Sequence, residues 1–221
     1  MRSICPFADY DFWGFLTSGG YLVAVFSLAL GINPFSEPTP PLLATILIIG
    51  AAYVVGHVNA ALSSFLLEDR LTALWVGRPV EILTGEKQPP LAIRKLLPRF
   101  SSPLSPLARA NLESKFSQPA RPSAQDVFFK AYHYSRRFSD SRERLDNFRN
   151  QYGFCRNAAM AALVSIPLWC SSASLLNISA AAAMTSAAFV ALMMFIRYLQ
   201  FYRHFALEAV NTFIYRDAEA A

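Results

Sequence analysis

Residues 157–196 read NAAMAALVSIPLWCSSASLLNISAAAAMTSAAFVALMMFI, forty consecutive positions without a charged side chain. A helix needs about 20 apolar residues to cross roughly 30 Å of bilayer hydrocarbon, so this run is long enough for two crossings. Two further uncharged runs occupy residues 12–36 and 38–67. The sequence therefore predicts a small polytopic membrane protein with four transmembrane helices, at about 12–32, 42–66, 157–176 and 178–197.

The amino-acid composition also favours a membrane protein. The 221 residues are 54% hydrophobic and only 16% charged, whereas soluble domains carry about 25% charged residues. The three cysteines, Cys5, Cys155 and Cys170, are scattered and lack CxxC spacing, which predicts neither a disulfide framework nor a zinc site. We expect an all-α protein that needs no cofactor and no metal.

The distribution of positive charge predicts the orientation in the membrane. Residues 68–156 carry 16 Lys/Arg and 9 Asp/Glu, a net charge of +7, whereas the whole chain is +5. The short connections at 33–41 and 171–179 contain no Lys or Arg. Because Lys and Arg accumulate on the cytoplasmic side, we expect residues 68–156 to be cytoplasmic. Both termini are then cytoplasmic too, with Arg2 at one end and Arg197, Arg203 and Arg216 at the other.

The expected organisation has five parts. They are a first transmembrane hairpin (1–67), a Pro-rich cytoplasmic segment (68–122), a basic cytoplasmic helix that leads into the third span (123–156), a second transmembrane hairpin (157–197), and a cytoplasmic C-terminal helix and tail (198–221). Eight prolines between 77 and 122 exclude long helices there, because proline interrupts the helix interior. Short helices are expected at 91–97 and 106–116.

The helices next to the second hairpin are predicted from helical spacing of apolar residues. Ser123, with Asp126 three residues later, predicts an N-cap, and the helix that follows should break at 138–141, where Ser and Asp compete for backbone hydrogen bonds. Beyond Arg197 an aromatic stripe extends the fourth span. We expect this stripe to form the core of a cytoplasmic helix bundle, packed on residues 124–156, and not a ligand cage. The stripe consists of Tyr198, Phe201, Tyr202, Phe205, Ala209 and Phe213.

The second span contains polar side chains, which in a membrane usually face other helices or a water-filled path. Two interpretations stay open. In the first, the span lines a pore at the axis of an oligomer, since four spans in one subunit are few for an internal conduit. In the second, small residues pack the helices closely, with Ser and Asn as hydrogen-bonding groups. The candidate pore-lining residues are Tyr53, His57, Asn59, Ser63 and Ser64.

Residues 130–157, KAYHYSRRFSDSRERLDNFRNQYGFCRN, interleave basic and aromatic side chains. Arginine and aromatic groups suit phosphates and stacked bases, which predicts an anionic ligand such as a nucleotide or single-stranded DNA. The alternatives are anchoring to anionic lipids, the ordinary cytoplasmic charge bias, and local pairing with nearby acidic residues. The candidate ligand-binding residues are Lys130, Arg136, Arg137, Arg142, Arg144 and Arg149.

Motifs of membrane enzymes are absent from the sequence. There is no serine nucleophile with a histidine in a separate span, no HExxH and no glycine-rich phosphate loop. We therefore expect a protein that is not an enzyme.

The chain also resembles a known type of membrane effector. The resemblance rests on the order of two spans, a basic insert that ends in NQYGFCRNAAM, two further spans, and the tail RYLQFYRHFALEAVNTF. Small four-span bacterial effectors of anti-phage operons share this architecture over most of the chain, in particular the channel-forming effector of Hailong-type defence systems. The resemblance implies a homo-oligomeric pore in the bacterial plasma membrane, held shut by DNA oligomers on the cytoplasmic side. The resemblance does not assign a functional residue of these effectors to any position in this chain.

Our functional hypothesis from the sequence is an oligomeric channel gated by an anionic cytoplasmic ligand, which depolarises the membrane in anti-phage defence. The alternative is a non-conducting scaffold or anchor, whose basic insert recruits a cytoplasmic partner, such as a protein of the same operon, or anionic lipid. A small transporter subunit is a third hypothesis, but the paired broken helices typical of transporters are missing.

Overall fold

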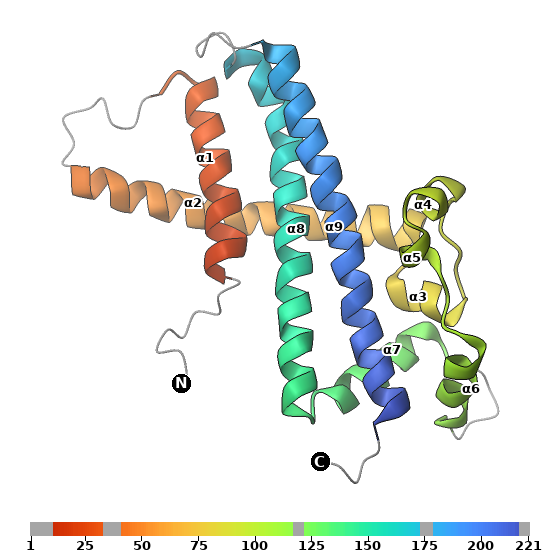
Figure 1. Ribbon diagram of the computed structural model, residues 1–221. Coiled ribbons are helices and arrows are strands. Elements are labelled where there is room, and N and C mark those ends of the chain that lie inside the picture. The colour runs from red at the N-terminus through yellow and green to blue at the C-terminus, as the bar shows by residue number, and fades with distance from the viewer. Residues whose placement is uncertain (1–10, 33–40, 117–121, 173–178, 217–221) are drawn as a thin grey trace. The chain divides into compact units, whose positions relative to one another are not determined.

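The computed structural model describes residues 11–32, 41–116, 122–172 and 179–216, which are helical with no strand among them. This confirms the all-α prediction for the described residues. Figure 1 shows the arrangement of the helices, and two π-helical stretches adjoin the first two α-helices. The elements are η1 (Asp11–Leu16), α1 (Thr17–Ala29), α2 (Pro41–Ser63), η2 (Ser64–Val76), α3 (Pro79–Thr84), α4 (Leu91–Leu96), α5 (Pro98–Ser101), α6 (Pro106–Ser114), α7 (Ala124–Ser135), α8 (Ser139–Ser172) and α9 (Ala180–Tyr215).

Two of the described helical stretches are long and apolar enough to cross a membrane. They are Leu42–Thr84 and Ala180–Tyr215, and a shorter apolar helix covers Gly14–Ala29. The third predicted span falls in the C-terminal half of α8, whose N-terminal half is polar. The ends of the chain and most of the two inter-span connections lie outside the described residues. A membrane protein is thus supported by two helices, and the four-span topology stays a prediction.

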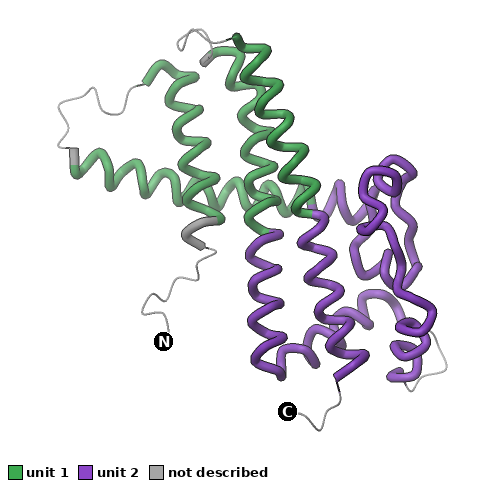
Figure 2. The backbone as a smooth tube through the Cα atoms, viewed as in Figure 1, with its two compact units in different colours: residues 1–67, 153–198 green, residues 68–152, 199–221 purple. Residues whose placement is uncertain are grey.

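The chain divides into two compact units (Figure 2). Unit 1 comprises residues 1–67 and 153–198, and unit 2 comprises 68–152 and 199–221. The divisions fall inside η2, α8 and α9, so these three elements each contribute residues to both units. Unit 1 holds the long apolar runs, and unit 2 holds most of the charged residues.

In unit 1, α1 crosses α2 at very short range because both helices carry glycine at the contact. A Cβ atom on Gly19 would overlap the backbone of Ala52, and one on Gly56 would overlap the backbone of Phe15. Ala52, Gly56 and Ala60 recur every four positions along α2 and are buried. Small residues at this spacing allow membrane helices to approach closely, as the packing interpretation of the second span predicts.

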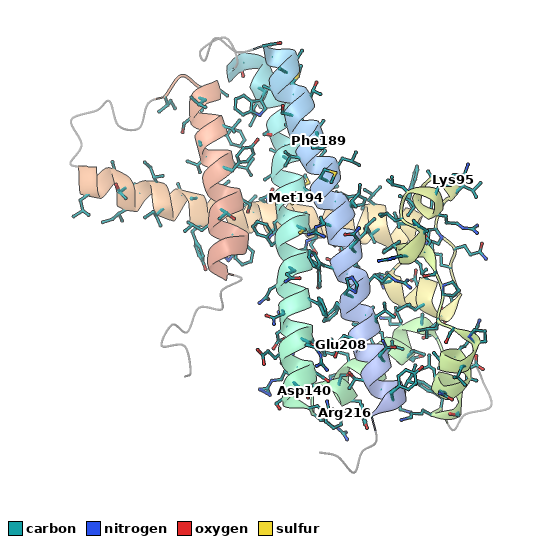
Figure 3. The ribbon with its side chains drawn as sticks, viewed as in Figure 1. Lys95, Asp140, Phe189, Met194, Glu208 and Arg216 are labelled. Atoms are coloured by element: carbon teal, nitrogen blue, oxygen red, sulfur yellow. The ribbon has the colours of Figure 1, made fainter. Side chains whose placement is uncertain are left out.

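Further contacts bring α8 into unit 1. The Tyr21 hydroxyl of α1 and the Ser165 hydroxyl of α8 lie 2.8 Å apart and share a hydrogen bond. Ala159 and Met160 of α8 form a small core with Leu67. Met194, labelled in Figure 3, packs against this core from α9.

Unit 2 has an aromatic core built by α6, α7, the first half of α8 and the last part of α9. The predicted stripe on α9 is confirmed as core at Phe205, Ala209 and Phe213, which are buried there, and Tyr202 packs against this core. The predicted cap is also confirmed, since the Ser123 hydroxyl accepts a hydrogen bond from the Asp126 backbone N–H at 3.2 Å. α7 ends at Ser135 and α8 begins at Ser139, close to the predicted break.

The Pro-rich segment of unit 2 forms four short helices, of which α6 is the longest with nine residues. Pro79, Pro98 and Pro106 each open a helix, a position where proline's missing N–H has no helical partner to lose. Gly77 and Gly85 flank α3 with φ of +98° and +74°, which favours glycine over residues with a side chain. The two short helices predicted in this segment are confirmed as α4 and α6.

We expect Gly56→Ala to lower the melting temperature of the detergent-solubilised protein. The added Cβ meets the Phe15 backbone, and overpacking of this kind typically costs about 1–3 kcal/mol. Gly50→Ala is the matched control on the same helix, because nothing lies within 4 Å of its added Cβ. Equal melting temperatures for the two variants, measured by circular dichroism, would contradict the α1–α2 contact.

Candidate functional site

Polar side chains of α2 and α8 form a buried hydrogen-bonded cluster in unit 1. The Asn59 Nδ2 donates to the Asn157 carbonyl oxygen at 2.9 Å, and the Ser63 hydroxyl donates to Asn157 Oδ1 at 2.7 Å. Arg156 Nε donates to the Ser63 hydroxyl at 3.2 Å. We call Asn59, Ser63, Arg156 and Asn157 the polar cluster. Two of the pore candidates, Asn59 and Ser63, thus form hydrogen bonds to α8 of the same chain.

The polar cluster is not fully satisfied. Asn59 and Asn157 are 3% and 0% exposed, yet Asn59 Oδ1 and Asn157 Nδ2 have no hydrogen-bond partner among the described residues. A buried polar group without a partner typically costs about 1–3 kcal/mol. A packing of α2 against α8 that gave these two atoms hydrogen-bond partners would recover this free energy.

The remaining pore candidates are Tyr53 and His57 on α2 and Ser64 at the start of η2. Tyr53 and His57 are exposed. The His57 ring stacks on Phe15 with ring centroids 4.1 Å apart, and its Nδ1 lies 3.0 Å from the Tyr53 carbonyl oxygen. Ser64 is half-buried and accepts a long, 3.5 Å hydrogen bond from Arg156. The five candidates therefore divide between an outer face of α2 and its buried contact with α8.

Three of the six predicted ligand-binding residues gather in unit 2. Arg136, Arg137 and Arg142 line an open hollow of about 430 Å³ together with Glu143 and Asp146. We call this the arginine hollow. Arg136 donates to the Tyr132 hydroxyl at 2.7 Å, and this hydrogen bond raises the pKa of the Arg136 guanidinium. Three cationic groups against two carboxylates leave a net positive surface that suits an anion.

The other three ligand candidates have different surroundings. Arg144 lies 3.4 Å from Asp140, one of the local acidic partners that the sequence offers, but its shorter hydrogen bond, at 2.7 Å, goes to the distant Glu208 of α9. Lys130 donates to the Lys115 carbonyl oxygen at 3.2 Å and sits over the Phe116 ring at 4.3 Å. Arg149 is exposed and does not line the arginine hollow.

Sequence reasoning missed a buried arginine in the middle of the aromatic stripe. Arg203 of α9 is only 9% exposed and donates to the carbonyl oxygens of Phe100 and Ser102, both at 2.7 Å. Burial lowers the pKa of Arg203 to about 10, so the guanidinium stays charged at neutral pH. The position of Arg203 within the aromatic stripe could have indicated that this arginine is buried. The ordinary excess of Lys and Arg on the cytoplasmic side explained its presence equally well. Asn157 was missed for a similar reason, as the first residue of an apolar run.

Comparisons with known proteins provide no further guidance to the site. No protein-family model matches the sequence, and no match was found among curated proteins or solved structures. Within the described residues, no group of three or more His, Cys, Asp or Glu side chains is placed to hold a metal ion. The function is therefore argued from the polar cluster, the arginine hollow and the helices that carry them.

A pH-dependent contact joins α8 and α9 in unit 2. Arg216 donates to Asp140 at 2.7 Å and holds the pKa of that carboxyl below its usual 3.8 (Figure 3). A depressed pKa in the folded state stabilises the fold above the unfolded pKa, and this contribution is lost as the pH falls through the folded value. We expect Asp140→Asn to melt at a lower temperature than wild type at pH 7, with a difference that shrinks below pH 3.8.

The matched control is Glu143→Gln, which makes the same charge change on α8 away from Arg216. Its melting temperature should follow wild type more closely at pH 7. A difference between Asp140→Asn and wild type that persists undiminished at pH 3 would show that the carboxylate does not stabilise the contact through its charge.

Proposed function

We propose that the chain crosses the membrane four times and assembles into an oligomeric channel gated by an anionic cytoplasmic ligand. The observation that carries the proposal is the continuity of α8, a single helix of 34 residues. Its first turns contribute Arg142 to the arginine hollow, and the same helix contributes Asn157 to the polar cluster. We propose that ligand binding at the first turns of α8 biases the packing of the polar cluster through this shared helix.

The exposed surface of the apolar helices supports assembly from several copies. In the most apolar windows of Leu42–Thr84 and Ala180–Tyr215, only 22% and 11% of the residues are buried. Most of this surface is thus left for lipid or for other subunits. We propose that the pore forms between copies, with the outer face of α2 that carries Tyr53 and His57 toward the axis.

The arginine hollow supplies the ligand chemistry. Guanidinium groups bind phosphate oxygens through paired, charge-assisted hydrogen bonds, and the hollow is open enough for a nucleotide or a single strand of DNA. Together with the resemblance to anti-phage effectors, this makes membrane depolarisation in defence the role that we propose. No step in it requires the chain to be an enzyme.

Ion flux from liposomes that carry the purified protein tests the proposal directly. Short single-stranded DNA on the side that exposes residues 68–156 should suppress or trigger the flux. Charge reversal at Arg137 and Arg142 should weaken DNA binding at least tenfold and flatten its salt dependence, because each lost phosphate contact lowers the salt slope by about 1. Arg109→Glu is the control, since this arginine pairs with Glu113 on α6 and lies outside the hollow.

The absence of flux from folded, correctly inserted protein, with and without DNA, would exclude the channel. The non-conducting scaffold, which recruits a cytoplasmic partner or anionic lipid, would then be the better description. Flux that DNA does not alter would support the channel but exclude the arginine hollow as its DNA-binding sensor.

The polar cluster gives a second prediction. Asn59→Leu combined with Asn157→Leu removes the two unpaired amide atoms together with the side-chain hydrogen bonds that Asn59 and Asn157 make. The Ser63 hydroxyl keeps the Ala60 carbonyl oxygen as an acceptor, so the double variant leaves no new buried donor without a partner. We expect the double variant to melt no lower than wild type but to need several-fold more or less ligand for half-maximal flux. Gln151→Leu, an exposed position on α8, should leave flux unchanged. Unchanged gating in the double variant would reduce the cluster to a packing contact.

A further inference from the structure

We propose that a second anion site lies in unit 2, in the cavity next to Arg203, and that it binds a single phosphate group or another compact oxyanion. The cavity has a volume of about 570 Å³ and is lined by residues of α4, α5 and α9. The polar side chains that line it are Arg99, Ser102, Gln200, Arg203 and His204. It shares no lining residue with the arginine hollow.

The charge of Arg203 is the first argument for this site. Both of its hydrogen-bonded partners are neutral, because its guanidinium donates to the Phe100 carbonyl oxygen and to the carbonyl and hydroxyl oxygens of Ser102. No carboxylate among the described residues pairs with it. A buried charge without an opposite charge is costly, so an anion in the cavity would be attracted by a cation that the fold itself leaves uncompensated.

The surroundings of Arg203 are the second argument. Arg99 and His204 are exposed at the cavity and offer N–H donors, and Gln200 adds an amide. The His204 ring is held in place by stacking on Phe148, with ring centroids 5.6 Å apart. None of the described lining residues is acidic, whereas in the arginine hollow Glu143 and Asp146 compete with a ligand for the arginines.

The position of Arg203 along α9 leaves two sources for the phosphate. Arg203 follows Arg197, the first charge after the apolar run, by six residues, which is about 9 Å along a helix. The head group of a membrane phospholipid is therefore within reach of the site, and so is a soluble phosphate compound. Leucines from α4 and α9 also line the cavity, including Leu96 and Leu207, and can accept an apolar group attached to the phosphate.

The experiment measures the melting temperature of the full chain in nanodiscs, with inorganic phosphate as the soluble probe and phosphatidylglycerol as the lipid probe. A ligand that binds only the folded state raises the melting temperature as its concentration exceeds its dissociation constant. We expect a rise of several degrees from inorganic phosphate in phosphatidylcholine discs if the source is soluble. A lipid source predicts the rise from phosphatidylglycerol instead, with little added by inorganic phosphate.

Variants assign the shift to the cavity. Arg203→Gln should reduce the affinity for the effective probe at least tenfold. Arg203 also donates hydrogen bonds to the backbone of residues 100–102, so its replacement could disturb the fold. Arg99→Gln combined with His204→Phe is a second test that keeps those hydrogen bonds. This double variant should also reduce the affinity for the probe. Arg94→Gln on α4 is the matched control outside the cavity and should keep the full shift.

No shift with either probe, from protein that melts cooperatively, would overturn the proposal. So would a shift that survives in both Arg203→Gln and the double variant, or one that is lost in Arg137→Glu, which would assign the anion to the arginine hollow. Binding is read here without ion flux, so this site and the proposed channel can fail independently.

Discussion

The contact between α1 and α2 depends on two side chains being absent. Gly19 and Gly56 let the helix backbones touch, and a close approach of this kind matters most where lipid surrounds the helices. Hydrocarbon is as apolar as leucine, so burying leucine there gains little, and backbone contact and hydrogen bonds must hold helices together. Unit 2 is built in the opposite way, around large aromatic residues such as Phe205 and Phe213, whose removal from water is favourable. The two interiors thus suit the two solvents of the proposed topology, lipid for unit 1 and water for unit 2.

The helices themselves were largely predictable from the sequence, because their determinants are local. The Ser123 cap, the interruption before Ser139 and the short helices α4 and α6 each depend on residues a few positions apart, whereas the short helices α3 and α5 were not predicted. The stripe on α9 was predictable too, since helical spacing identifies a buried face. The four-span topology follows less directly from local sequence. The helical stretches that contain α2 and α9 are long and apolar enough to cross a membrane, whereas the other apolar stretches are shorter, so four crossings stay a prediction.

The candidate sites were predicted only in part, because spacing identifies a face but not what lies opposite. Asn59 and Ser63 were recognised as unusual, but their partner Asn157 is almost a hundred positions away along the chain. Among the arginines, Arg137 and Arg144 look alike in sequence. Only the fold places Glu208 next to Arg144 and leaves Arg137 at an open hollow. Arg203 was hidden for the same reason, since its partners at 100–102 are about as distant.

The hydrogen bonds of Arg203 also set an order of events during synthesis. A chain made from its N-terminus exposes the Pro-rich segment long before α9 exists, and the Phe100 carbonyl oxygen receives its arginine 103 positions later. The aromatic core likewise needs Phe205, Ala209 and Phe213 of α9, which follow α6 and α7 in the chain. Contacts between such distant positions form slowly, because a long loop must close first. Unit 2 therefore cannot complete its core until the last part of α9 has been synthesised, and until then its short helices are exposed to chaperones and proteases.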